Sequence, residues 1–233
     1  ELSDALLKVS KGTSSKTTNP ILEGIKLSTD EDNLVLTATD LELSIEKTIR
    51  AEVKLEGETV VPGKLFNEYI KKLSNEQIEL NLNENNVLSI KYTDSVGKIQ
   101  CLNPQEFPQI KQVDYTDYFE ITQNDLRNLI NKSIFSVAQE DTRPILKGCK
   151  IEVDDGYVKS IALDGYRLAV VKKPVSKATS KFSVIVPARS LNEISKLLTE
   201  SEDLVKVYIQ KNYLMIDLDN TKITTRLLDG NYI

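Results

Sequence analysis

Apolar and polar residues alternate with a period of two along most of the chain, which predicts β-strands. The clearest examples are GIKLST, NLVLTAT, ELSIEKTI, IELNL and NVLSIKY in the first half, and CKIEV, YVKSIAL, RLAVVKK, FSVIVP, VKVYI, YLMIDL and KITTRLL in the second. Pairs that favour tight turns fall between these segments: Asp155-Gly156, Asn85-Asn86, Lys211-Asn212 and Asp219-Asn220. The pattern therefore predicts sheets built from antiparallel hairpins.

Four segments follow helical spacing instead, over residues 2–12, 63–73, 123–135 and 188–198. Pro62 and Pro187 directly precede two of them, and proline suits the start of a helix because it has no N–H to satisfy. The expected buried stripes are Leu2, Leu6 and Val9; Leu65, Tyr69 and Leu73; Leu126, Leu129 and Ile130; and Leu191, Ile194 and Leu198. We therefore expect an α+β fold, with antiparallel sheet and helices on one face.

The chain contains an internal repeat in three blocks. TNPILEGIKL (18–27) matches TRPILKGCKI (142–151), LTATDLELSI (36–45) matches SIALDGYRLAV (160–170), and VVPGKLFNEYIKKL (60–73) matches IVPARSLNEISKLL (185–198). Because the order and the spacing of the blocks are kept, we expect two copies of one domain, at about 1–114 and 115–233. Residues 102–118, with two prolines and few apolar positions, form the expected connector.

The composition is that of a globular protein, with 40% hydrophobic and 28% charged residues. No apolar run approaches the 20 or so residues of a membrane helix, and no secretory signal is visible. The chain has no histidine, which removes the commonest general base and metal ligand. Cys101 and Cys149 lack metal-ligand spacing, so we interpret them as small buried residues in a reducing compartment. We expect no metal and no cofactor.

Two aspartates attract attention as a possible catalytic pair. Asp40 and Asp164 occupy equivalent positions in the two copies, so they lie about one domain apart in the sequence. A duplicated Asp is better explained as the acceptor that closes a turn. The acidic runs at 30–32 and 154–155 fall at hairpin positions and lack the ligand spacing of a calcium loop.

Charge is divided unevenly between the predicted helices and the rest of the chain. The helices, with the loop to Lys16, carry a net charge of +6, whereas the whole chain carries −5, which leaves −11 for the remainder. The basic residues are Lys8, Lys11, Lys16, Lys64, Lys71, Lys72, Arg127, Lys132, Arg189 and Lys196, and the acidic ones are Asp4, Glu68, Asp125 and Glu193. Such a face would attract phosphate without reading base sequence, although lysines also occur on ordinary solvated helices. The absence of Trp and the few aromatic residues disfavour single-strand binding.

The strings TNPILEG, LTATDLELSI, VVPGKLF, TRPILKG, LDGYRLAV and IVPARSL, in this order, resemble the bacterial DNA polymerase III beta subunit, or beta sliding clamp, family. The resemblance implies a non-catalytic processivity factor in the cytoplasm, associated with the nucleoid. Family members have three such domains per subunit, and two subunits close head to tail into a ring with helices inside and sheets outside. This chain would correspond to the first two domains, without the first strand and without the third domain.

The resemblance also implies two sites. Positions that face duplex DNA would be Lys16, Lys71, Arg143, Arg189 and Lys196, although Glu140, close to Arg143, departs from the pattern because a carboxylate repels phosphate. The second site is a cleft for short peptides of the polymerase alpha subunit and the clamp loader, lined by Leu146, Leu163, Gly165, Tyr166, Arg167 and Leu168. Leu163 stands where the family often has Thr, which would make the pocket more apolar.

Two other functions stay open at this point. A carboxylate-dependent hydrolase on the same duplicated scaffold would need titratable groups that converge outside the repeat equivalences, and the sequence offers none. A scaffold that binds only proteins would show no salt-sensitive attraction to DNA.

Overall fold

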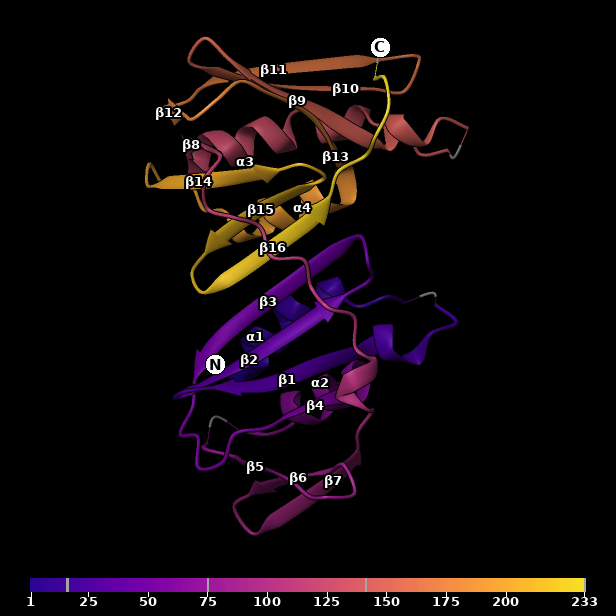
Figure 1. Ribbon diagram of the computed structural model, residues 1–233, viewed down its shortest axis with the longest axis vertical. Coiled ribbons are helices and arrows are strands. Elements are labelled where there is room, and N and C mark those ends of the chain that lie inside the picture. Colours follow the sequence, from indigo (N-terminus) through magenta and orange to yellow (C-terminus); the bar gives the residue numbers. More distant parts are fainter. Residues whose placement is uncertain (16, 75, 141, 233) are drawn as a thin grey trace. The chain divides into compact units, whose positions relative to one another are not determined.

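The computed structural model describes residues 1–15, 17–74, 76–140 and 142–232. The chain divides into two compact units, Glu1–Ile110 and Lys111–Ile233 (Figure 1). The division falls slightly before the boundary expected at residue 114. Each unit contains two α-helices and two antiparallel sheets among its described residues, and the α+β expectation is confirmed.

Unit 1 begins with helix α1 and places its second helix directly after a strand. Its helices are α1 (Leu2–Val9) and α2 (Gly63–Lys71). One sheet has the order β3 (Leu43–Arg50), β2 (Asn33–Thr39), β1 (Gly24–Asp30) and β4 (Glu58–Pro62). The other has the order β5 (Glu79–Leu82), β6 (Val87–Tyr92) and β7 (Ser95–Gln100).

Unit 2 repeats this order of elements with two additional strands, β8 before its first helix and the short β12 between β11 and β13. Its helices are α3 (Gln123–Asn131) and α4 (Ala188–Leu197). One sheet has the order β12 (Lys177–Ala178), β8 (Tyr118–Thr122), β14 (Leu204–Gln210), β15 (Tyr213–Leu218) and β16 (Thr221–Arg226). The other has the order β11 (Leu168–Pro174), β10 (Tyr157–Leu163), β9 (Gly148–Asp154) and β13 (Phe182–Pro187). None of the described helices has the length and apolar character needed to cross a membrane.

The core of unit 2 lies where both helices meet both sheets. Phe119 of β8, Ile130 of α3, Ile151 of β9, Ile194 of α4 and Leu214 of β15 line one small apolar cavity and are all almost fully buried. Side chains at alternate positions of each strand point into this core, which accounts for the period-two pattern of the sequence. The remaining face of each helix is left for polar residues.

The predicted buried faces are correct for α3 and α4, since the leucines and isoleucines named for them are buried, but the face predicted for α2 is wrong. Phe66 and Ile70 are buried there, whereas Leu65 is 53% exposed. The cause is the close approach of Gly63 to the backbone, since a Cβ at this position would lie 2.7 Å from the carbonyl oxygen of Glu23. This contact fixes how the helix is rotated about its axis. The sequence alone did not decide which face is buried, because α2 has apolar residues on two adjacent stripes.

Each unit contains one buried free cysteine, as the sequence indicated. Burial raises the pKa of the Cys101 thiol, and it raises the pKa of the Cys149 thiol to about 11. Cys149 lies beside the hydroxyl groups of Ser133 and Ser160, whose oxygens are 2.7 Å apart. Both thiols are therefore protonated and inert at neutral pH.

The equivalent aspartates close equivalent turns, which confirms the structural interpretation. In unit 1, Oδ1 of Asp40 accepts hydrogen bonds from the backbone N–H groups of Glu42 (3.0 Å) and Leu43 (2.8 Å). In unit 2, Oδ1 of Asp164 accepts from the N–H groups two and three residues later, both at 3.0 Å. The residue after each aspartate has a positive φ, +76° at Leu41 and +95° at Gly165.

In these two turns, a substitution at the residue with positive φ should change the stability of the unit in opposite directions. Leu41 adopts a conformation that costs a residue with a Cβ about 1–2 kcal/mol, and its side chain is 63% exposed. Leu41→Gly should therefore stabilise unit 1 by about 0.5–1 kcal/mol, after the larger chain entropy of unfolded glycine is allowed for. Gly165→Ala should destabilise unit 2 by about 1 kcal/mol, although no atom would clash with the new Cβ. Urea unfolding of each variant measures both effects, and a destabilising Leu41→Gly would contradict the explanation.

Candidate functional site

The basic residues expected to face DNA lie on exposed parts of the helices and of one loop. Lys71 is in the last turn of α2, Arg189 is in the first turn of α4, and Lys196 is in the last turn of α4. Arg143 is exposed immediately before η5 (Pro144–Lys147), and Lys16 lies outside the described residues. Lys71 belongs to unit 1 and the other three to unit 2, so the structure brings no complete set together within one unit.

Not all of these cations are available to a phosphate. Nζ of Lys196 lies 2.8 Å from Oε1 of Glu193, one turn earlier on the same helix. Lys196 and Lys71 also sit at helix C-termini, where a cation is favoured by the helix dipole whatever the function. Glu140 is exposed near Arg143, so the departure noted in the sequence lies at the surface.

Two of the residues expected to form the peptide cleft, Leu146 and Leu163, belong to one apolar cluster of unit 2, called the floor below. Leu146 is buried in a cluster with Ile185 and Tyr232, and Leu163 and Leu228 pack against this cluster. The hydroxyl group of Tyr232 donates a hydrogen bond of 2.8 Å to the carbonyl oxygen of Gly148. These contacts give the site an ordered apolar floor.

The other expected residues, 165–168, lie in or next to the turn between β10 and β11, which follows Leu163 directly; this turn and the side chains beside it are called the rim below. Leu163 and Leu168 are directly opposite each other in the pairing of the two strands. Leu168 is 63% exposed and Tyr166 is fully exposed, while Gly165 provides the backbone conformation that closes the turn. Exposed apolar groups beside an ordered apolar floor are the arrangement that a peptide with apolar anchors requires.

Phe135 is a residue of this rim that the sequence did not single out. It lies in η4 (Ile134–Ser136), is 59% exposed, and has the guanidinium carbon of Arg167 at 5.8 Å from its ring centroid. The sequence placed it at the end of a continuous helix, whereas α3 stops at Asn131. Only the short turn after that helix brings Phe135 to the rim. The helical spacing of apolar residues did not predict this turn.

Asp164 holds the rim together electrostatically. Its Oδ2 lies 2.8 Å from Nε of Arg167, and its Oδ1 accepts two backbone hydrogen bonds. The backbone N–H groups of Tyr166 and Arg167, followed by the Arg167 side chain, lower the pKa of the Asp164 carboxyl below its ordinary value. This carboxylate and its equivalent Asp40 are thus both engaged in closing their turns.

Comparison with known families matches both units. The N-terminal domain of the DNA polymerase III beta subunit matches residues 1–111, and the central domain of the same subunit matches residues 120–233. A beta sliding clamp of Halalkalibacterium halodurans is 37% identical over 235 residues, covering 96% of this chain and 62% of its own length. One from Staphylococcus epidermidis is 32% identical over 240 residues, covering 100% of this chain and 63% of its own length.

Solved structures agree with the sequence relatives. A DNA polymerase sliding clamp from Bacillus subtilis superposes with a TM-score of 0.95 at 30% identity, covering 100% of this chain and 63% of the other. The DNA polymerase III subunit beta from Pseudomonas aeruginosa gives a TM-score of 0.91 at 29% identity, covering 99% and 63%. The chain thus spans less than two thirds of the length of these relatives.

The lowered pKa of Asp164 predicts a pH-dependent contribution to the stability of unit 2. The native state favours the carboxylate, so the contribution is complete above the ordinary Asp pKa and disappears as pH falls through the lowered native value. Asp164→Asn keeps an acceptor oxygen but removes the charge. We expect the wild type to be more stable than this variant at neutral pH, and the difference to vanish in acid. Urea unfolding over about pH 2.5–7 measures it, and a difference that is independent of pH would contradict the assignment.

Proposed function

Because the chain belongs to the DNA polymerase III beta subunit family, we propose that it forms two domains of a ring that encircles duplex DNA and tethers polymerases to it. The ring carries out no chemistry of its own. Two full-length subunits close it head to tail, with the helices of each domain towards the DNA and the sheets towards solvent.

The partition of charge is the observation that carries this proposal. Helices and the loop to Lys16 have a net charge of +6 against −11 elsewhere, and the described helix cations of unit 1, Lys8, Lys64, Lys71 and Lys72, are all exposed. Duplex DNA carries one negative charge for about every 1.7 Å of its axis, so a basic lining attracts it at any sequence. Contacts to the backbone alone do not specify a register, which permits sliding.

The cleft of unit 2 supplies the tether. We propose that Leu146, Leu163 and Leu168 receive the apolar anchors of a peptide from the polymerase alpha subunit or the clamp loader, while Tyr166 and Arg167 flank it. The apolar floor is already ordered by Tyr232 and Ile185, so the site loses little conformational freedom when it binds.

A topological experiment tests the ring. A full-length subunit carrying this sequence is loaded by a clamp loader onto a nicked circular plasmid, washed at high salt, and the DNA is then linearised. Electrostatic contacts weaken steeply with salt, whereas a threaded ring is held by its closure. We expect retention on the circle and release on cutting. Loss of the protein in the wash, with an active loader, would overturn the ring, and no attraction to DNA even at low salt would favour the protein-only scaffold.

A pair of matched leucines tests the cleft. Leu168→Ser removes an exposed apolar group of the rim, whereas Leu204→Ser removes one of similar exposure at the start of β14, outside the cleft. With a labelled peptide that carries leucine and phenylalanine anchors, Leu168→Ser should weaken binding by about tenfold or more. Leu204→Ser should leave the affinity unchanged, as measured by fluorescence anisotropy. Equal losses in both variants would exclude the rim as the peptide site.

A further inference from the structure

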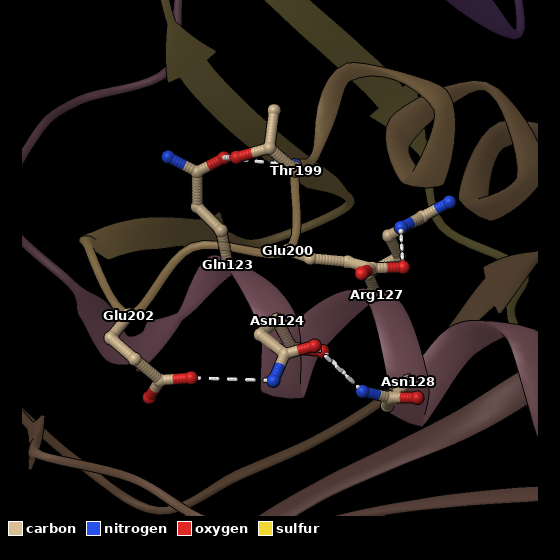
Figure 2. A network of polar contacts seen from close by, with 7 residues as sticks. All are labelled: Gln123, Asn124, Arg127, Asn128, Thr199, Glu200 and Glu202. Atoms are coloured by element: carbon tan, nitrogen blue, oxygen red, sulfur yellow. Dashed lines mark hydrogen bonds and ion pairs between the residues drawn. The ribbon is translucent and has the colours of Figure 1, made fainter.

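The loop that follows α4 is fixed to the first turn of α3 by backbone and amide contacts (Figure 2). The N–H of Gln123 donates to the carbonyl oxygen of Asp203 at 2.9 Å, and the N–H of Asn124 donates to that of Ser201 at 3.0 Å. The N–H and hydroxyl groups of Thr199 both donate to Oε1 of Gln123 at 3.1 Å. These contacts hold residues 199–203 in place without help from the acidic side chains of the loop.

The fixed loop presents two carboxylates to the exposed side of α3. Oε1 of Glu200 lies 2.9 Å from Nη1 of Arg127, and Oε1 of Glu202 accepts a hydrogen bond of 3.3 Å from the amide of Asn124 (Figure 2). Asn124 in turn accepts from the amide of Asn128 at 2.9 Å. One carboxylate therefore neutralises a cation, whereas the other faces a neutral amide.

The helices of unit 1 differ in this respect. Among the described residues, no carboxylate pairs with Lys8, Lys64, Lys71 or Lys72. In unit 2, Arg127 is paired with Glu200 across the loop and Lys196 is paired with Glu193 on α4, whereas no carboxylate among the described residues pairs with Lys132. A count of charges along the sequence treats all these cations alike, although their availability to a phosphate differs.

On the basis of the proposed function, we propose that Arg127 is a contact to the DNA backbone that Glu200 masks. The side chain of Glu200 is 80% exposed, so the ion pair is well solvated and weak, and a phosphate can take the place of the carboxylate. A guanidinium group binds phosphate through two parallel N–H donors, which favours that exchange.

Two isosteric substitutions in the same loop test whether the Glu200 carboxylate masks Arg127. Glu200→Gln frees Arg127 and should tighten binding of this chain to a fluorescent duplex about three- to tenfold at 50 mM salt. Because Glu200 keeps Arg127 from the phosphate in part of the wild-type complexes, its removal should also steepen the plot of log affinity against log salt, by at most about 0.9. Glu202→Gln removes the same charge from the same loop but releases no cation, so it should change affinity by less than about twofold and leave the slope unchanged.

The same substitutions in an Arg127→Gln background complete the cycle. There, Glu200→Gln should have no larger effect than Glu202→Gln, because no cation remains to be released. Equal effects of the two loop substitutions in the wild-type background would overturn the mask and leave a general repulsion by the loop. If neither the wild type nor any variant bound duplex DNA with a dependence on salt, the assignment of these helices to DNA would itself fail. Thermal unfolding of each variant checks that it is still folded.

Discussion

Burial of the apolar faces of α3 and α4 against both sheets of unit 2 determines what the rest of that unit can present. Leu126, Leu129, Leu191 and Ile194 take the inward positions, and these are the stripes at helical spacing. The outward positions of these short helices are then left largely for polar and charged groups. Arg127, Arg189 and Lys196 lie on the other side of these helices. The packing that buries the apolar face therefore also exposes the candidate DNA-facing residues.

The cleft depends on the other sheet of the unit in a similar way. Antiparallel pairing of β10 with β11 places Leu168 opposite Leu163, and the turn between them is closed by Asp164. The hydrogen bonds of that carboxylate keep the backbone of the turn in one conformation. Tyr166 and Arg167 are therefore presented by an internally rigid turn, which suits the proposed peptide site.

Much of the fold followed from the sequence because repeated blocks, alternation and helix spacing all agreed. The prediction failed where a single contact decided between two stripes, as the approach of Gly63 to Glu23 did for α2. Phe135 escaped notice because its position depends on where α3 ends. The pairing of Arg127 with Glu200 could not be predicted either, since Glu200 is 73 residues away in the sequence and only the packing of α4 against α3 brings its loop there. Local patterns predict elements and charges, whereas contacts decide which charges are available.

The two buried thiols give the chain one chemical probe in each half. A thiol must both reach solvent and ionise to react, and Cys101 and Cys149 are covered and have raised pKa values in the native state. Alkylation by a small reagent would thus occur only during transient opening, and the labelling rate of each cysteine would report the opening free energy of its own unit. Mass spectrometry of the two peptides would then separate the dynamics of the halves within a single, unmodified chain.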